Sequence, residues 1–232
     1  MESHALVLLA ASQIDDNATA PGAVVTLTSA AIAFALAFPL RWLSVHALTA
    51  VHEGGHLLFG LWGGGRVTHV HVDRNGGGET NYGFIPPVDD FVASAMGYLG
   101  PPVAGLLFAD ILAHGRFAAV LWLTVAFLVF LLLFLRKVFG RVYVVLLGFF
   151  FVAVLVKASP DLRLITATAW TWYLMTAGML DILVLWGDAT DYDFLLPTFV
   201  SREGWAVVNL VLSVVAMIWG GLLLVGAQEP FL

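Results

Sequence analysis

The chain has no cysteine among its 232 residues, which excludes disulfides, cysteine-bound zinc and thiol nucleophiles. It also has few charges, because Asp, Glu, Lys and Arg make up 11% of the residues, compared with about 25% in ordinary soluble domains. Hydrophobic residues reach 60%, and the mean hydropathy is +0.93. We therefore predict an integral membrane protein in contact with a lipid bilayer.

Basic residues are too few and too scattered to form a patch that neutralises phosphates, and the net charge is −6. Nucleic-acid binding is therefore not expected. The segments outside the apolar runs are too short for a PDZ-like or nucleotide-sensing domain, so no nucleotide partner is expected either. Nothing in the sequence indicates an oligomeric state.

Apolar runs of roughly the length of a membrane helix recur along the chain. We predict seven, at about residues 24–40, 43–62, 91–113, 117–135, 142–156, 164–186 and 205–225. The first two are so close in sequence that we expect them to form an antiparallel pair. The predicted fold class is an all-α polytopic membrane protein of about seven transmembrane helices, with a short β-hairpin after the second.

The predicted organisation is a single transmembrane domain between two tails. Residues 1–22 have a short apolar run without a basic flank, which favours a polar tail over a cleaved signal. The transmembrane domain covers residues 23–226, including a hairpin segment, 63–90, and an acidic loop, 187–204; residues 227–232 form the C-terminal tail.

The hairpin prediction rests on residues 66–84. Residues 66–73 alternate with period two, residues 75–78 supply an asparagine and three glycines for a turn, and residues 79–84 can form the return strand. We expect this hairpin to lie at the membrane surface. The alternative interpretation of this segment is a solvated connector.

The second apolar run contains His52, Glu53 and His56 in the sequence HEGGH. Ionisable groups inside a membrane helix are costly, so they usually face the bundle interior and have a function. Histidines four residues apart lie about 40° from each other on a helix, so both imidazoles can bind one cation. Glu53 can then stand beside the metal and take a proton from a metal-bound water. The pattern is that of a zinc hydrolase.

This motif in a membrane helix, followed by Gly60, residues 63–65 and a polar hairpin, resembles the site-2 protease family of intramembrane zinc metallopeptidases. The resemblance is greatest to the short B-like branch and extends more loosely over residues 43–226. It implies that His52 and His56 bind Zn²⁺, that Glu53 is the catalytic glutamate, and that the substrate is a membrane protein cut in or near its transmembrane segment.

The resemblance also gives the hairpin a function. In the family, a hairpin in this place is thought to present an edge to an extended substrate, and backbone pairing would suit an unwound helix. The substrate-binding residues would then be Val70, Val72, Gly78 and Thr80.

A catalytic zinc usually has three protein ligands, and Asp181 is the candidate for the third. The second and sixth runs cross in the same direction, and His56 and Asp181 lie at matching depths near their ends. In the family the third ligand is an aspartate in a later span, and Leu180 before Asp181 agrees with that pattern. The glycine that often follows this aspartate and the preceding Asn/Pro signature are missing here.

Several other residues compete for a place at the site. The rivals of Asp181 as third ligand are Asp188, Asp191 and Asp193 in the acidic loop, which is otherwise a solvated segment. His69 and His71 point to one face of a strand and could bind metal, although a polar rim is the simpler interpretation. His46 lies on the same helical face as Glu53 and could be its hydrogen-bond partner.

Two other functions remain open. The chain could be an inactive family relative that acts as a membrane binding or regulatory protein, or a metal or proton transporter that uses its His and Asp residues as a relay. We expect a multi-pass protein of a bacterial cytoplasmic membrane.

The charge distribution gives the expected orientation. The basic residues divide between the two sides as Arg66, Arg74, Arg136, Lys137, Arg141 and Arg202 against Arg41, Arg116, Lys157 and Arg163. This excess favours placing the hairpin and the N-terminus in the cytoplasm.

Overall fold

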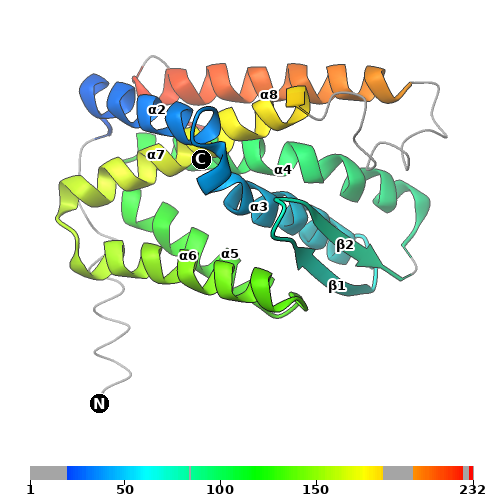
Figure 1. The fold of residues 1–232 in the computed structure, drawn as a ribbon. Coiled ribbons are helices and arrows are strands. Elements are labelled where there is room, and N and C mark those ends of the chain that lie inside the picture. The colour runs from blue at the N-terminus through cyan, green and yellow to red at the C-terminus, as the bar shows by residue number, and fades with distance from the viewer. Residues whose placement is uncertain (1–19, 84, 185–200, 227–229, 232) are drawn as a thin grey trace.

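The computed structural model describes residues 20–83, 85–184, 201–226 and 230–231, which form seven helices and one two-stranded hairpin (Figure 1). The helices are α2 (Ala23–Ala37), α3 (Arg41–Trp62), α4 (Pro87–Ala113), α5 (Phe117–Leu132), α6 (Val138–Lys157), α7 (Pro160–Val184) and α8 (Arg202–Leu224); the strands are β1 (Val67–Val72) and β2 (Gly78–Tyr82). Each predicted apolar run corresponds to one helix, and the predicted hairpin is confirmed. Helix α4 is central, because it contacts α3, α7 and α8.

The junction between α2 and α3 differs from the prediction. The two helices meet at an angle of 95°, so the expected antiparallel pair is wrong. The break contains Pro39, which has no backbone N–H and disfavours helical backbone at Phe38. Helix α2 instead packs on α7, where the Ser29 hydroxyl donates to the carbonyl of Ile165 at 3.3 Å.

Three helical segments are long and apolar enough to cross a membrane: Val88–Ala113, Val138–Lys157 and Glu203–Leu224. Helices α2 and α3 pass the same test only together, as one broken span or a re-entrant segment, and α5 is apolar but shorter. The described part of the chain is therefore a helical membrane protein with three or four crossings by length and composition. Seven separate crossings are not confirmed.

The hairpin folds back along α3. Its turn at Gly76 lies against Val45, and Tyr82 at the end of β2 lies against Gly60. The Thr49 hydroxyl donates to the Gly76 carbonyl at 2.6 Å, which fixes the turn on the helix. The hairpin thus extends along most of the motif helix.

The two edges of the hairpin differ. On β1, the Val70 N–H donates to the Phe134 carbonyl at 3.0 Å, and the Arg136 N–H donates to the Val70 carbonyl at 3.1 Å. The segment after α5 therefore covers the outer edge of β1. Val70 pairs with Thr80 in the antiparallel register, and because the backbone groups of Val70 point outward, those of Thr80 also point away from β1. Among the described residues, no backbone hydrogen bond from another segment covers the outer edge of β2.

Glycines allow α3 to pack closely in the core. A Cβ at Gly55 would overlap the backbone carbonyl of Met96 in α4, and one at Gly54 would overlap the ring of Phe127 in α5. The glycines cost helix propensity, and the close packing of neighbouring elements explains why they are tolerated.

The proline pair Pro101–Pro102 does not break α4, which remains one helix and packs these prolines against Gly178 of α7.

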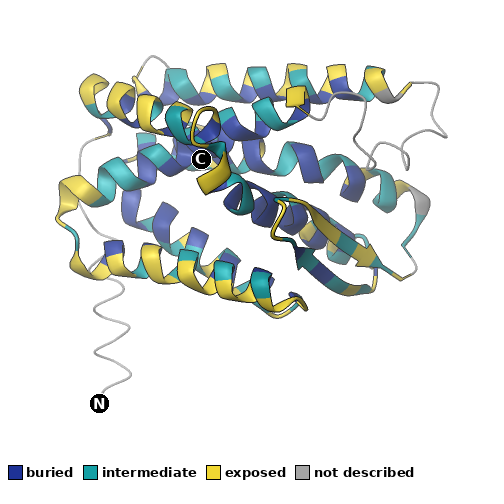
Figure 2. Cartoon of the chain, viewed as in Figure 1, coloured by how far each residue is buried: buried dark blue, intermediate teal, exposed yellow. Residues whose placement is uncertain are grey.

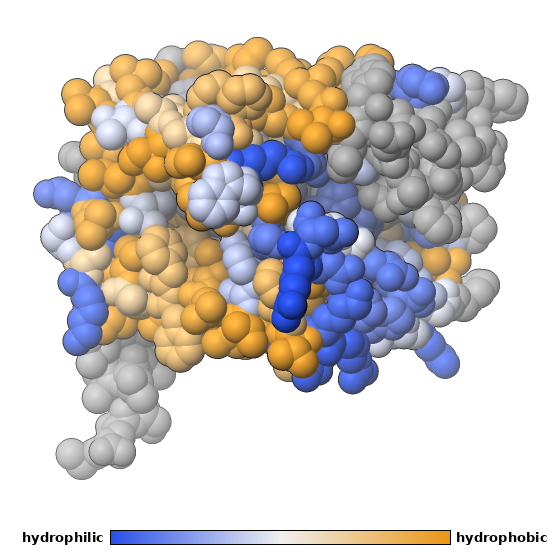
Figure 3. Space-filling view, viewed as in Figure 1, coloured by the Kyte–Doolittle hydropathy of each residue, from blue (hydrophilic) through white to orange (hydrophobic). Residues whose placement is uncertain are grey.

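Burial and polarity are distributed as expected for a membrane protein. Buried residues lie between the helices, while exposed residues cover the outward faces of α6 and α8 (Figure 2). Many of these exposed residues are large and apolar, such as Phe149, Ile218 and Trp219. Hydrophilic residues gather instead over the hairpin (Figure 3). The apolar surface suits lipid, and the polar surface marks the side of the molecule where water reaches the hairpin.

Candidate metal centre

Helix α3 places His52 and His56 on one face, as their spacing predicts. Their Nε2 atoms lie 3.1 Å apart. Two nitrogens bound to one tetrahedral zinc ion at about 2.0–2.1 Å would be separated by about 3.3 Å, so this pair is already close to a ligand geometry. His56 is 5% exposed, whereas His52 is half-buried.

A carbonyl from α4 orients the ring of His56. Its Nδ1 lies 2.8 Å from the carbonyl oxygen of Ala93, and because a carbonyl only accepts, Nδ1 must carry the hydrogen. In the neutral imidazole, Nε2 then keeps its lone pair. This is the arrangement in which a metal-binding histidine is held by its other nitrogen, so the residues fit a zinc ion.

The imidazoles are also packed tightly against α4. A Cβ at Gly97 would overlap the ring of His56 and would lie 2.8 Å from Nε2 of His52. The ring of the neighbouring Tyr98 packs edge-on against His52, with centroids 4.6 Å apart. Glycine is thus required where α4 approaches the Nε2 atoms of both histidines.

Glu53 is 4% exposed and lies against the hairpin. Its Oε2 accepts a hydrogen bond of 2.6 Å from the Thr80 hydroxyl, which comes from β2. A Cβ at Gly78, two residues earlier on the strand, would overlap the Glu53 carboxylate. The hairpin therefore fixes the position of the glutamate, and Gly78 makes room for it.

These residues line one cavity of about 750 Å³ between α3, α4, α7 and the hairpin. Asp181 of α7 lines the same cavity, but ligand atoms of Asp181, His52 and His56 do not all lie within 4.8 Å of one another, so the structure does not bring the three predicted ligands together. Its Oδ1 accepts a hydrogen bond of 2.6 Å from Arg41, at the start of α3. The rival ligands Asp188, Asp191 and Asp193 lie outside the described residues.

The structure places the other candidate residues as follows. His46 was a candidate partner of Glu53, and its Nε2 lies 3.1 Å from the carbonyl oxygen of Arg74. The Thr80 hydroxyl donates a hydrogen bond to Glu53. Gly78 and Thr80 line the cavity. Val70 and Val72 are fully buried on the other strand.

The hairpin histidines form a second group with Glu79; the two histidines do not line this cavity, whereas Glu79 does. Their rings stack with centroids 4.5 Å apart, and Glu79 lies across from His71 on β2. Burial, with a smaller effect of Lys137, lowers the pKa of His71 below its usual value of 6.5.

Three residues of the site were not anticipated from the sequence. Arg41 was assigned to a loop on the side opposite the hairpin, yet it lines the cavity together with hairpin residues. The Ala93 carbonyl belongs to the backbone, so the residue type gives no indication that it contacts His56. Tyr98 lies inside the predicted apolar run at 91–113, where no motif marks it as a neighbour of His52.

The fold and this site define a helical membrane protein with a buried His-Glu-His centre suited to metal-dependent hydrolysis. The model of the Peptidase M50B-like family matches residues 23–220, so the chain belongs to that family. This agrees with the resemblance to the B-like branch of the site-2 proteases. Neither a curated protein nor a solved structure gives a significant match to the chain.

Proposed function

We propose that the protein is an intramembrane zinc metalloendopeptidase that cleaves membrane-anchored proteins in or near a transmembrane segment, as in regulated intramembrane proteolysis. The observation that carries the proposal is the pair of facing Nε2 atoms of His52 and His56, held by a carbonyl beside a buried Glu53. Membership of a peptidase family supports the same reaction.

In this proposal, His52, His56 and Asp181 hold the zinc ion. A bound zinc ion would polarise the scissile carbonyl and lower the pKa of a water molecule toward about 7. Asp181 must then exchange its ion pair with Arg41 for the metal or share its two oxygens between them. Asp188 and Asp191 are the alternatives for this place, and the experiment below separates them.

Glu53 is proposed to move the proton. It would take a proton from the attacking water as general base and deliver it to the leaving amine as general acid. The hydrogen bond from Thr80 holds one oxygen of the carboxylate in place. The carboxylate is buried, which keeps bulk water away from the reacting groups.

The substrate is proposed to bind as a strand on β2. The backbone groups of Thr80 point outward from the hairpin, and by strand alternation those of Gly78 do the same. Both residues line the cavity that contains Glu53, so a strand paired there would pass the catalytic glutamate. Val70 and Val72 would support the site from behind, because the outer edge of β1 is covered.

We further propose that all seven helices are embedded in a bacterial cytoplasmic membrane, with the hairpin and the N-terminus on the cytoplasmic side. The ion pair between Lys137 and Asp73, at 2.7 Å, supports the grouping of the hairpin with the basic segment after α5. Arg41 lines the cavity, so it no longer counts for the opposite side, and the excess of basic residues on the hairpin side increases.

The proposal is tested with the full chain in liposomes, together with a panel of single-span membrane proteins. We expect bound zinc, and cleavage sites that mass spectrometry maps to the transmembrane segments or their ends. One bound zinc ion should be lost in His52→Ala, relative to the zinc content of the natural chain. It should also be lost in Asp181→Ala but kept in Asp188→Ala and Asp191→Ala.

Each other outcome has a defined meaning. If zinc is lost in Asp188→Ala or Asp191→Ala and retained in Asp181→Ala, the third ligand is the aspartate of the acidic loop and not Asp181. Zinc bound through His52 without cleavage of any panel member would favour an inactive relative with a binding function. Zinc transport into the liposomes without cleavage would favour a transporter.

A further inference from the structure

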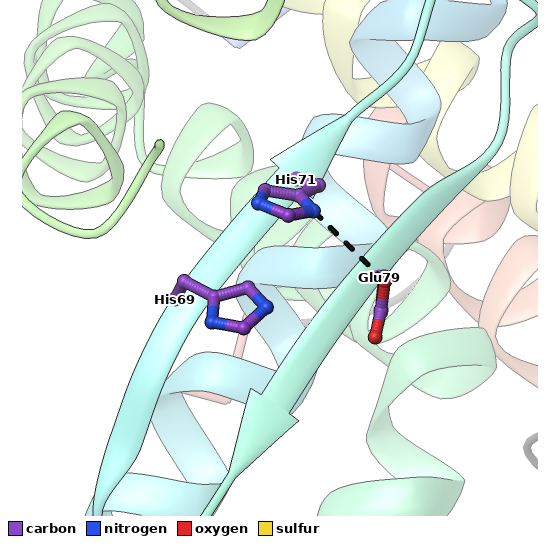
Figure 4. Close-up of side chains that lie close together, drawn as sticks. All are labelled: His69, His71 and Glu79. Carbon is purple, nitrogen blue, oxygen red and sulfur yellow. Dashed lines mark ion pairs between the residues drawn. The ribbon is translucent and has the colours of Figure 1, made fainter. Parts of the chain in front are cut away.

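We propose that the hairpin carries a second divalent transition-metal site, formed by His69, His71 and Glu79. One ligand atom from each residue lies within 4.8 Å of the other two. It is the one group of three such ligands found within the part of the chain that the structure describes. Figure 4 shows the two imidazoles on β1 and the carboxylate on β2.

The strand geometry explains why these three side chains meet. His69 and His71 are two residues apart, so they project from the same face of β1. Glu79 is the cross-strand partner of His71, which places its side chain on that same face. Nδ1 of His71 and Oε2 of Glu79 lie 3.9 Å apart. Glu79 is exposed, so a change of its rotamer can close the group around an ion.

A second observation points to a ligand. Nδ1 of His71 is buried and has no hydrogen-bond partner among the residues that the structure describes. A buried polar atom without a partner is costly, and a bound cation would satisfy this lone pair. Two imidazoles and one carboxylate suit Zn²⁺, Ni²⁺ or Cu²⁺ rather than Mg²⁺ or Ca²⁺, which prefer oxygen ligands.

This site would act on the hairpin rather than on the reaction. A metal bound to both strands would tie β1 to β2 through the face that carries His69 and His71. Glu79 and Thr80 are adjacent, so their side chains lie on opposite faces of β2, and Thr80 holds Glu53. The hairpin metal would therefore stiffen the strand that positions the catalytic glutamate.

The test is zinc binding to the full chain in nanodiscs, measured by elemental analysis and calorimetric titration. In the double variant His52→Ala and His56→Ala we expect one zinc ion to remain, and we expect it to be lost when His69→Gln and His71→Gln are added. The control His114→Gln removes an imidazole far from the hairpin and should leave zinc binding unchanged. Ni²⁺ should compete for the remaining site, and Mg²⁺ should not.

A double variant that binds no zinc would overturn the proposal. If that variant does not fold, the decision comes from His69→Gln and His71→Gln in the natural background, where bound zinc should fall from two ions to one. An unchanged zinc content there would equally overturn it. This outcome is independent of the proposed protease. The His52→Ala variant tests zinc binding on α3. Zinc that remains after both His52 and His56 are replaced tests the hairpin site.

Discussion

The protein contains two groups of two histidines and one glutamate, one on α3 and one on the hairpin. On α3 the histidines are four residues apart and meet in a buried cavity, while Glu53 hydrogen-bonds the hairpin. On the hairpin the histidines are two residues apart, and Glu79 lies on their own face. The same three residue types therefore produce different centres because the helix and the strand have different periods.

The difference concerns the role left for the carboxylate. At the helical centre, the glutamate can stay out of the ligand set and remain available to carry a proton. At the hairpin centre, all three side chains converge, so the glutamate becomes a ligand and no base is left beside the metal. The first arrangement suits catalysis and the second suits a structural ion.

The sharpest test of this comparison makes the same change at both centres. Glu53→Gln should lower the rate of peptide hydrolysis by about 10²–10⁴-fold, because a general base is lost, while zinc at His52 and His56 is retained. Glu79→Gln should leave the α3 centre nearly as active and should weaken zinc binding at the hairpin. Rate and zinc content are measured on the same preparations. Equal losses of activity in the two variants would contradict the distinction.

A second test crowds the helical centre only. Gly97→Ala places a methyl group against both imidazoles, and overpacking of this kind costs about 1–3 kcal/mol. We expect zinc to be lost from the α3 site and kept at the hairpin. Gly100→Ala, one turn further along α4, is the matched control, because its Cβ would lie at an acceptable 3.4 Å from Cα of Gly55. Normal zinc binding in Gly97→Ala would show that α4 does not press on the rings.

A third test addresses the contact that joins the two groups. Thr80→Val keeps the shape of the side chain but removes the hydrogen bond to Glu53, and such bonds to charged groups contribute about 1.5–3 kcal/mol. Hydrolysis should therefore slow by about tenfold or more. Thr80→Ser keeps the hydroxyl and should retain most of the rate. If the two variants have the same rate, the hydroxyl does not position Glu53.

The smallest effect is expected at the ion pair that joins the hairpin to the segment after α5. Lys137→Gln removes the ion pair with Asp73, in which both side chains are substantially exposed. Exposed pairs contribute about 0–1 kcal/mol, so the thermal unfolding midpoint should change little and the hairpin should keep its zinc. A large loss of hairpin zinc in Lys137→Gln would mean that this ion pair, and not the strand register, holds the metal ligands together.

The features that could be predicted from the sequence depend on local periodicity. The helical spacing of His52 and His56 gave their shared face, and the alternation of residues 66–73 with the following glycines gave the hairpin. The apolar runs gave the positions of all seven helices in the described chain. In each case the signal lies within one element and does not depend on the packing of others.

The features that were missed depend on contacts between distant segments. Arg41 and Asp181 are separated by 140 positions, and nothing in either neighbourhood indicates their pairing. The carbonyl of Ala93 orients His56 through the backbone, which no residue type reveals. The antiparallel pairing of the first two helices was wrong because a short loop with a proline allows a bend as readily as a reversal.

Helices α2 and α3 meet at 95°, and the number of times this bent pair crosses the membrane decides whether the N-terminus and the hairpin lie on the same side. If the two helices cross separately, the N-terminus and the hairpin share one side of the bilayer, as proposed above. If they form a single broken crossing, the two lie on opposite sides, and every later loop keeps its relation to the hairpin. Two accessibility labels, one near the N-terminus and one in the hairpin turn at Gly76, therefore identify a single broken crossing when they lie on opposite sides; two crossings or a re-entrant pair place them on the same side.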